Sequence, residues 1–162
     1  MCIRDSTIYS TALQQVQFHA IFQCQQDGII SDGYSKLSKK PERVKLWPGE
    51  IPHHWLFEKC TAILHHGGSG TIATALLARK PQIICPVMFD QEFWAELLSW
   101  KELAVRCSSL KQLEAKELVR GLRSVCSGAM VERIEEIACA LMNENGVQTA
   151  LKKLLNACSQ VS

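Results

Sequence analysis

The amino-acid sequence predicts an α/β fold: a doubly wound, mostly parallel, Rossmann-like sheet with helices on both faces. Short apolar runs alternate along the chain with longer segments of helical pattern, as in β-α units. The runs are short and mostly apolar, as strands are when helices cover both faces of a parallel sheet. A glycine-rich turn, His65–Thr71, also joins one apolar run to an alanine-rich segment, which is the order strand, turn, helix.

The amino-terminal part of the chain contains one helical pattern and two apolar runs. Residues 7–17 carry apolar side chains roughly on one helical face, which predicts a helix. The run 18–24 predicts a buried strand, and the segment 27–42, rich in Gly, Ser, Asp and Lys, predicts a loop. We expect a second strand at 44–47, closed by the dipeptide 48–49, Pro-Gly.

Prolines bound the elements in the middle of the chain. Pro52 begins a short helix expected at 53–59, and a third strand is expected at 61–64. A helix is expected at 70–79, stopped by Pro81.

The rest of the chain repeats the alternation and then becomes helical. A fourth strand is expected at 82–85, stopped by Pro86, then a helix at 91–101 and a short fifth strand at 103–106. Three further helices are expected, the last two punctuated by glycines: 113–126, 130–143 and 147–155.

Composition indicates one globular domain. A chain of 162 residues with 47% hydrophobic and 21% charged residues is long and apolar enough to bury a core. A net charge of +2 gives no electrostatic case for binding nucleic acid, and no apolar run approaches the length of a membrane span. We expect a non-native or disordered tail at 1–6, one domain at 7–158 and a second tail at 159–162.

The eight cysteines indicate free thiols. They form no C-x-x-C pair, and several lie inside apolar runs, such as those around Cys85 and Cys139. Buried free thiols of this kind are typical of proteins in a reducing compartment. The sequence therefore predicts a cytoplasmic location and no disulfide framework.

The turn His65–Thr71 predicts a site for a phosphorylated ligand. Its glycines let the backbone approach a ligand closely, and the helix that follows begins with unpaired N–H groups. These groups and the positive end of the helix dipole favour an anion. Ser69 and Thr71 add hydroxyl groups to the same turn.

Three loops are expected to meet at one edge of the sheet. Ligands of doubly wound folds bind outside the carboxyl ends of the strands. The pair His65-His66, the segment Pro86–Gln91 and the segment Pro48–His53 each follow a predicted strand. They are therefore candidate parts of one binding site.

Four blocks of sequence together resemble the UDP-sugar glycosyltransferases of family 1, in the pattern of the sterol 3-beta-glucosyltransferase branch. The blocks are Ile51–Phe57 (IPHHWLF), His65–Thr71 (HHGGSGT), Lys80–Gln82 (KPQ) and Pro86–Ala95 (PVMFDQEFWA). The resemblance extends over residues 18–155 and implies the carboxyl-terminal, sugar-donor-binding half of a GT-B fold.

The resemblance implies a role for each matching residue. His65 would contact the donor diphosphate with its side chain facing the ligand, while strand alternation would point His66 to the other face. The diphosphate set is His65, His66, Gly67, Gly68, Ser69, Gly70 and Thr71. Asp90 and Gln91 would hydrogen-bond the sugar hydroxyls. The nucleobase side would be bordered by Ile51, Pro52 and His53.

The chain also departs from the family pattern. Arg79 stands where the family has glycine, so it must adopt a glycine-like conformation or the helix must end differently. The amino-terminal half, which in the family binds the acceptor and carries the histidine base, has no counterpart here. The resemblance thus implies no catalytic residue in this chain, which would need that half in cis or in trans. The full-length enzyme could then lie peripherally at a membrane.

Alternative interpretations of the same residues remain open. Asp90 could only cap the following helix, and the histidines His65 and His66 could be structural. A metal site is a further alternative for His53, His54, His65 and His66, although the family implied by the resemblance needs no metal or other cofactor. The aromatic residues are expected in the core: Trp55, Phe57, Phe93 and Trp94.

The leading hypothesis is a domain that binds UDP-glucose for transfer of the hexose to a sterol or another lipid-like or small hydrophobic alcohol. We expect the chain to be inactive alone. The alternative is a non-catalytic or partner-dependent subunit that binds a nucleotide sugar. A phosphate-binding domain of unrelated function would leave the Asp90-Gln91 pair and the block Ile51–Phe57 unexplained.

Overall fold

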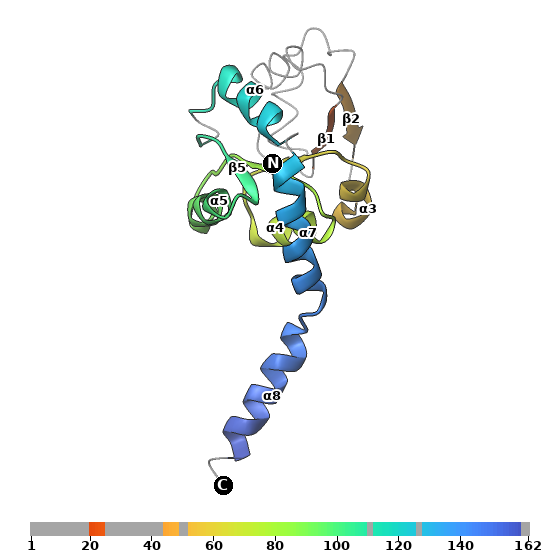
Figure 1. Ribbon diagram of the computed structural model, residues 1–162, viewed down its shortest axis with the longest axis vertical. Helices are drawn as coiled ribbons and strands as arrows, with labels where there is room; N and C mark the ends of the chain where they lie inside the picture. The colour runs from red at the N-terminus through yellow and green to blue at the C-terminus, as the bar shows by residue number, and fades with distance from the viewer. Residues whose placement is uncertain (1–19, 25–43, 49–51, 110–111, 126–127, 160–162) are drawn as a thin grey trace.

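The computed structural model describes residues 20–24, 44–48, 52–109, 112–125 and 128–159 (Figure 1). The expected helix at 7–17, the expected loop at 27–42 and the expected tail at 1–6 lie outside these residues. The strands in these ranges are β1 (Ala20–Cys24), β2 (Val44–Pro48), β3 (Ile63–His65), β4 (Gln82–Ile84) and β5 (Ala104–Arg106). The helices in the same ranges are α3 (His53–Glu58), α4 (Ser69–Leu77), α5 (Asp90–Trp100), α6 (Ala115–Ser124), α7 (Gly128–Met142) and α8 (Gly146–Ser159).

The described strands form two parallel sheets. β1 pairs with β2, and a second sheet has the order β3-β4-β5 with both pairings parallel. A parallel sheet with intervening helices confirms the predicted α/β fold class. Each described element lies within a few residues of its predicted position, although the strands are grouped in two sheets where the sequence predicted one.

Helices cover both faces of the central strand β4, whose two isoleucines point to opposite faces. On one face, a Cβ added to Gly67 would lie 2.8 Å from Cγ2 of Ile84 and 3.5 Å from Cβ of Gln91, at the start of α5. On the other face, a Cβ added to Gly121 of α6 would lie 3.7 Å from Cγ2 of Ile83. The doubly wound arrangement is thus visible in the packing around one strand.

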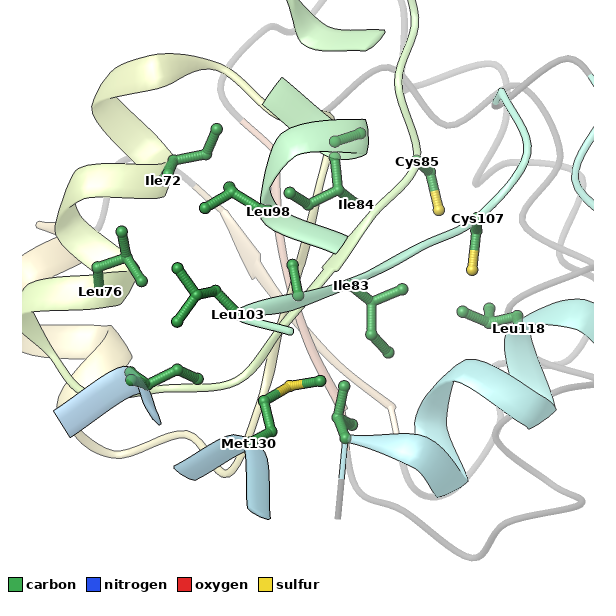
Figure 2. Close-up of a cluster of buried hydrophobic side chains, with 14 of the residues drawn as sticks. Ile72, Leu76, Ile83, Ile84, Cys85, Leu98, Leu103, Cys107, Leu118 and Met130 are labelled. Carbon is green, nitrogen blue, oxygen red and sulfur yellow. The ribbon is translucent and has the colours of Figure 1, made fainter. Parts of the chain in front are cut away.

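One hydrophobic core joins the sheet to its helices (Figure 2). The fully buried Ile83 and Ile84 lie at its centre, and side chains from four helices pack around them. Figure 2 shows among these Ile72, Leu76, Leu98, Leu118 and Met130. This packing holds the carboxyl ends of β3 and β4 and the starts of α4 and α5 in fixed relative positions.

Two helices end in left-handed residues that are not glycine. Arg79 follows α4 with φ of 55°, and its N–H donates to Leu76 O while the N–H of Lys80 donates to Ala75 O. This is the Schellman pattern of a helix end, which glycine adopts most easily. The glycine-like conformation expected of Arg79 is therefore confirmed, and Glu102 ends α5 in the same way, with φ of 56°.

The last helix, α8, extends away from the rest of the described structure (Figure 1). None of its residues is buried, and its side chains Val147, Leu151, Leu154 and Leu155 are exposed. No helix in the described ranges is long and apolar enough to cross a membrane.

Candidate functional site

The glycine turn after β3 packs directly against the loop after β4. Gly67 has φ of 93°, and a Cβ there would lie 2.8 Å from Ile84 Cγ2 and 3.4 Å from the backbone oxygen of Gln91. His53 of the third loop lies near enough to His65 to lower the pKa of His65 electrostatically. The structure thus brings together the glycine turn and the start of α5, while residues 49–51 of the third loop lie outside the described residues.

His65 lies inside the protein. Its side chain is 5% exposed, Nε2 lies 2.9 Å from Oε1 of Gln82, and Nδ1 accepts a hydrogen bond of 3.0 Å from the N–H of Gly67. Burial disfavours the charged imidazole and lowers the pKa of His65 to about 4, against a weaker opposing effect of the bond to Gln82. Both ring nitrogens are thus engaged by the protein, and the ring is neutral at physiological pH.

His66 lies at the open side of the turn. Its imidazole covers Gly68, because a Cβ on Gly68 would lie 2.8 Å from its Nε2. Partial burial lowers the pKa of His66, while the nearby carboxylate of Asp90 raises it. Neither ring nitrogen is hydrogen-bonded to another residue in the described part of the chain.

The orientation expected for this histidine pair is therefore wrong. Strand alternation does send the two side chains to different environments, but His65 points inward and His66 outward. The physical reason is the polar partner inside the sheet: Gln82 on the adjacent strand satisfies an imidazole buried there. The structure thus bears out a structural role for His65 and leaves His66 available to a ligand.

The start of α4 has the features of an anion site. Gly68 precedes the helix in extended conformation, and the first helical bond runs from the N–H of Ile72 to Gly68 O. The N–H groups of Ser69, Gly70 and Thr71 therefore have no acceptor within the helix. No acidic residue lies in the first turn, and no side chain caps it. A negatively charged group at this point would be stabilised by both the N–H groups and the helix dipole.

Asp90 and Gln91 begin α5 at the same edge. Oδ2 of Asp90 accepts a hydrogen bond of 3.1 Å from the indole N–H of Trp94. Oε1 of Gln91 accepts bonds from the backbone N–H groups of Val87 and Met88, at 3.0 and 3.2 Å. Among the described residues, nothing bonds to Oδ1 of Asp90 or to the amide nitrogen of Gln91, so an acceptor and a donor remain.

The alternative that Asp90 only caps α5 is wrong. The residue before the helix is Phe89, and no side chain forms a capping hydrogen bond at this end. The carboxylate of Asp90 instead bonds along the helix to Trp94. Its charge still lies in the first turn, where the helix dipole favours it.

Phe89 is strained and exposed beside this pair. Its backbone has φ of 53° and ψ of −131°, a conformation that glycine takes far more easily, and its side chain is 86% exposed. Met88 and Phe93 are also exposed, as is Trp55 on α3. Of the aromatic residues expected in the core, Phe57 is buried and Trp94 partly so, but Trp55 and Phe93 are not.

The corner expected at the nucleobase is described in part. Ile51 lies outside the described residues, and the exposed Pro52 precedes α3. The ring of His53 stacks on that of Phe57, with centroids 4.9 Å apart and planes 11° from parallel. His53 is thus held by an aromatic side chain of its own helix, near the buried His65.

Comparisons with known proteins agree with this architecture. Residues 27–104 match the family model described as "Erythromycin biosynthesis protein CIII-like, C-terminal domain". Over 131 residues the chain is 36% identical to a sterol 3-beta-glucosyltransferase of Arabidopsis thaliana, which covers 78% of this chain and 21% of that protein. Over 152 residues it is 34% identical to the sterol 3-beta-glucosyltransferase of Pichia angusta, covering 89% and 12%.

Solved structures give the same result for the fold. A glycosyltransferase of kitacinnamycin superposes with a TM-score of 0.75 at 20% identity, over 94% of this chain and 39% of that one. The glycosyltransferase SnogD from Streptomyces nogalater gives 0.69 at 23% identity, over 95% and 40%. The chain belongs to the GT-B glycosyltransferases. It corresponds to their carboxyl-terminal domain and spans only part of the length of these relatives.

Two cysteines of this GT-B domain face one another behind the site. Cys85 and Cys107 follow β4 and β5, both are buried free thiols, and Figure 2 shows their sulfur atoms side by side. Their mutual hydrogen bond and burial raise the pKa of Cys85. Cys139 was also expected to be buried but is exposed, because Ile134 and Ala138 take the inward positions of α7.

The metal alternative gains no support from the described residues. In the ranges that the structure describes, no group of three or more His, Cys, Asp or Glu side chains is placed to hold a metal ion. Sequence reasoning gave no role to Gln82, which lies in the block Lys80–Gln82 and whose side chain contacts His65. A glutamine inside an otherwise apolar strand was the signal, because such an amide needs a buried partner.

Proposed function

We propose that this domain binds a UDP-sugar, with UDP-glucose favoured, for transfer of the hexose to a sterol or another hydrophobic alcohol. The observation that carries the proposal is the start of α4: three unpaired N–H groups, no acidic residue and an outward imidazole. The sterol 3-beta-glucosyltransferase relatives support the sugar and the acceptor class. A neighbour in fold, the glycosyltransferase VinC, was solved with dTDP, another nucleoside diphosphate.

His66 is the histidine that we assign to the diphosphate. Its ring lies over Gly68, the residue before α4, and neither ring nitrogen is hydrogen-bonded among the described residues. A bound diphosphate would raise the pKa of His66, since a nearby negative charge favours the imidazolium form. The charged ring would then donate a charge-assisted hydrogen bond to a phosphate oxygen.

Asp90 and Gln91 are assigned to the hexose. The free Oδ1 of Asp90 would accept from a sugar hydroxyl, and the amide nitrogen of Gln91 would donate to another. The bonds of Gln91 Oε1 to Val87 and Met88 fix which end of the amide is presented. Sugar hydroxyls are recognised by such oriented pairs, whereas a carboxylate repels phosphate.

In the whole enzyme, an acceptor hydroxyl would attack the anomeric carbon and displace UDP with inversion. The new bond joins the acceptor oxygen to that carbon, and the bond to the diphosphate oxygen breaks. This domain would stabilise the negative charge that develops on the leaving diphosphate through the start of α4 and His66. The base that takes the acceptor proton would come from the amino-terminal half, so the chain alone is expected to transfer no sugar.

Titration calorimetry with UDP tests the proposal. The wild-type chain should bind UDP and UDP-glucose, and His66→Ala should weaken both by about tenfold or more, as expected for a lost charge-assisted bond. His54→Ala is the control, because His54 is an exposed histidine of α3. Failure of the folded wild-type chain to bind UDP, or equal affinities for wild type and His66→Ala, would contradict the proposal.

Assays for glucosyl transfer distinguish the two hypotheses, the donor-binding domain of an enzyme and the non-catalytic or partner-dependent subunit. Supplied with UDP-glucose and a sterol, the purified chain should give no product, whereas a chain completed with an acceptor-binding half should. Product from the chain alone would contradict the assignment of the base to the other half. A UDP-binding chain that no such half makes active would favour the non-catalytic subunit.

A further inference from the structure

We propose that His65 and Gln82 are positioning residues, a buried pair that fixes the glycine turn so that His66 and the start of α4 face the diphosphate. The inference rests on the proposed sugar-donor site. It assigns to His65 a task different from the ligand contact that the sequence suggested, and it gives Gln82 a function in the same site.

The pair bridges two adjacent strands below the turn. In the β3–β4 ladder, His65 is paired with Ile84 and Ile63 with Gln82, so His65 and Gln82 are diagonal neighbours on one face. Their side chains meet at 2.9 Å between Nε2 and Oε1, and both residues are buried. The hydrogen bond therefore connects the end of β3 to the rigid centre of the sheet.

The contacts of His65 require one tautomer. The N–H of Gly67 can only donate, so Nδ1 of His65 must carry the lone pair that accepts its bond of 3.0 Å. The ring proton is then on Nε2, where it is donated to Oε1 of Gln82. The N–H of Gly67 thus requires this tautomer, and Gln82 stabilises it by accepting the proton of Nε2.

The bond to Gly67 fixes the direction of the turn. Gly67 has φ of 93° and lies against Ile84, so the chain reverses there with no space for a side chain. His66 and Gly68 flank this fixed point, and α4 begins at the next residue, Ser69. A shift of Gly67 would therefore move the imidazole of His66 and the N–H groups of α4 together.

Gln82 is poorly explained as a purely stabilising residue. Its amide nitrogen is buried and has no hydrogen-bond partner among the described residues, which disfavours folding. A leucine would bury a similar volume without that unsatisfied group. The oxygen that orients His65 accounts for an amide at this position.

Charge on His65 would oppose the arrangement. A proton on Nδ1 would face the N–H of Gly67, so the bond that holds the turn would be lost. Burial, which lowers the pKa of His65 to about 4, keeps the ring neutral. The groups that act electrostatically on it, His66 and His53, also lower its pKa. The turn should therefore keep its position throughout the physiological pH range.

Nitrogen NMR of the histidine rings gives the first test. In the wild-type chain, the ring of His65 should show a protonated Nε2 and an unprotonated Nδ1, with no titration between pH 5.5 and 8, a window set at about 1.5 pH units above its lowered pKa. His66 should titrate and respond to added UDP. A protonated Nδ1 on His65, or titration of His65 within that window, would overturn the inference.

UDP binding by variants gives the second test. Gln82→Leu should bind UDP about tenfold more weakly, as expected for a disturbed hydrogen-bonded site, and the Nε2 resonance of His65 should shift because its proton loses its acceptor. Ile83→Val is the matched control, since Ile83 is the next buried residue of β4 and points to the other face; its UDP affinity should not change. His65→Asn, whose Oδ1 can accept from Gly67, should bind more tightly than His65→Leu.

The outcomes distinguish this inference from the proposed function. A folded wild-type chain that does not bind UDP overturns the sugar-donor site and this inference with it. A wild-type chain that binds UDP while Gln82→Leu binds equally well overturns this inference alone. If His65→Leu does not fold, the Gln82→Leu comparison and the wild-type tautomer still decide.

Discussion

The starts of α4 and α5 lie at the same edge of the sheet and differ in the charge of their first turns. Both follow parallel strands, and neither has a side-chain capping bond. The first turn of α4 has no acidic residue, whereas that of α5 has Asp90 and Glu92. One helix start therefore attracts an anion, and the other repels it and presents a carboxylate to neutral hydroxyls.

This difference in charge assigns the two parts of a nucleotide sugar to different helices. Its diphosphate fits the start of α4, and its hexose fits the start of α5. Glu92 is paired with Arg106 at 3.1 Å, whereas Asp90 has no cationic partner among the described residues. The local charge at each helix start thus sets the order of the diphosphate and the hexose along the edge. Four predictions test this comparison of the two helix starts.

Gly67→Ala should have the largest effect. A methyl group would lie 2.8 Å from Ile84 at a φ of 93°, so strain and overpacking should cost about 3 kcal/mol of unfolding free energy. Chemical denaturation measures it. Gly70→Ala, where a Cβ meets nothing within 4 Å, should keep or raise stability and yet weaken UDP binding, since the methyl group would occupy the anion's approach. Equal stability losses in the two variants would contradict the account of the turn.

Acidification should destabilise the α4 side of the site through His65. Its pKa of about 4 in the folded chain lies below the ordinary 6.5, so the stabilisation is complete above pH 6.5 and is lost as the pH falls to 4. The loss should be about 3 kcal/mol relative to His65→Asn, which cannot titrate there. Denaturation curves of both proteins from pH 7 to pH 4 measure it, and parallel pH profiles would show that His65 is not buried as a neutral ring.

Asp90→Ala should weaken binding of UDP-glucose by roughly 1.5–3 kcal/mol and leave UDP binding almost unchanged, because the carboxylate is assigned to the hexose alone. Calorimetry with both ligands measures the difference. Glu92→Ala is the control in the same helix turn and should affect neither ligand much. If Asp90→Ala weakened both ligands equally, the division of the ligand between α4 and α5 would be wrong.

Ser69→Asp gives α4 the charge pattern of α5 and should have the smallest effect on folding. A carboxylate in the first turn should raise stability by about 0.3–1 kcal/mol through the helix dipole. The same charge should repel the diphosphate and lower UDP affinity. Ser69→Asn is the uncharged control, and tighter UDP binding by Ser69→Asp than by Ser69→Asn would contradict the anion assignment.

The sequence was sufficient for features that depend on local pattern. Apolar runs, prolines and glycines placed the described elements, and the family pattern at Arg79 gave its left-handed conformation as one of two alternatives. These depend on residues near one another in the chain.

Features that depend on contacts between distant residues could not be predicted in this way. The alternation of side chains along β3 predicts that His65 and His66 face different sides. It does not predict which of them is buried, because that depends on the position of Gln82 on the next strand. Periodicity in α5 likewise could not show that Phe93 is exposed, because the inward positions are taken by Ala95 and Leu98. The site residues were found by motif, and their orientation required the packed sheet.

Amide chemical-shift mapping of the isotopically labelled chain tests the central claim most directly. On addition of UDP, the amides of Ser69, Gly70 and Thr71 and the ring of His66 should shift, while those of Asp90 and Gln91 should move further only with UDP-glucose. Shifts produced by UDP elsewhere in the chain, with the start of α4 unaffected, would contradict the claim that this helix start holds the diphosphate.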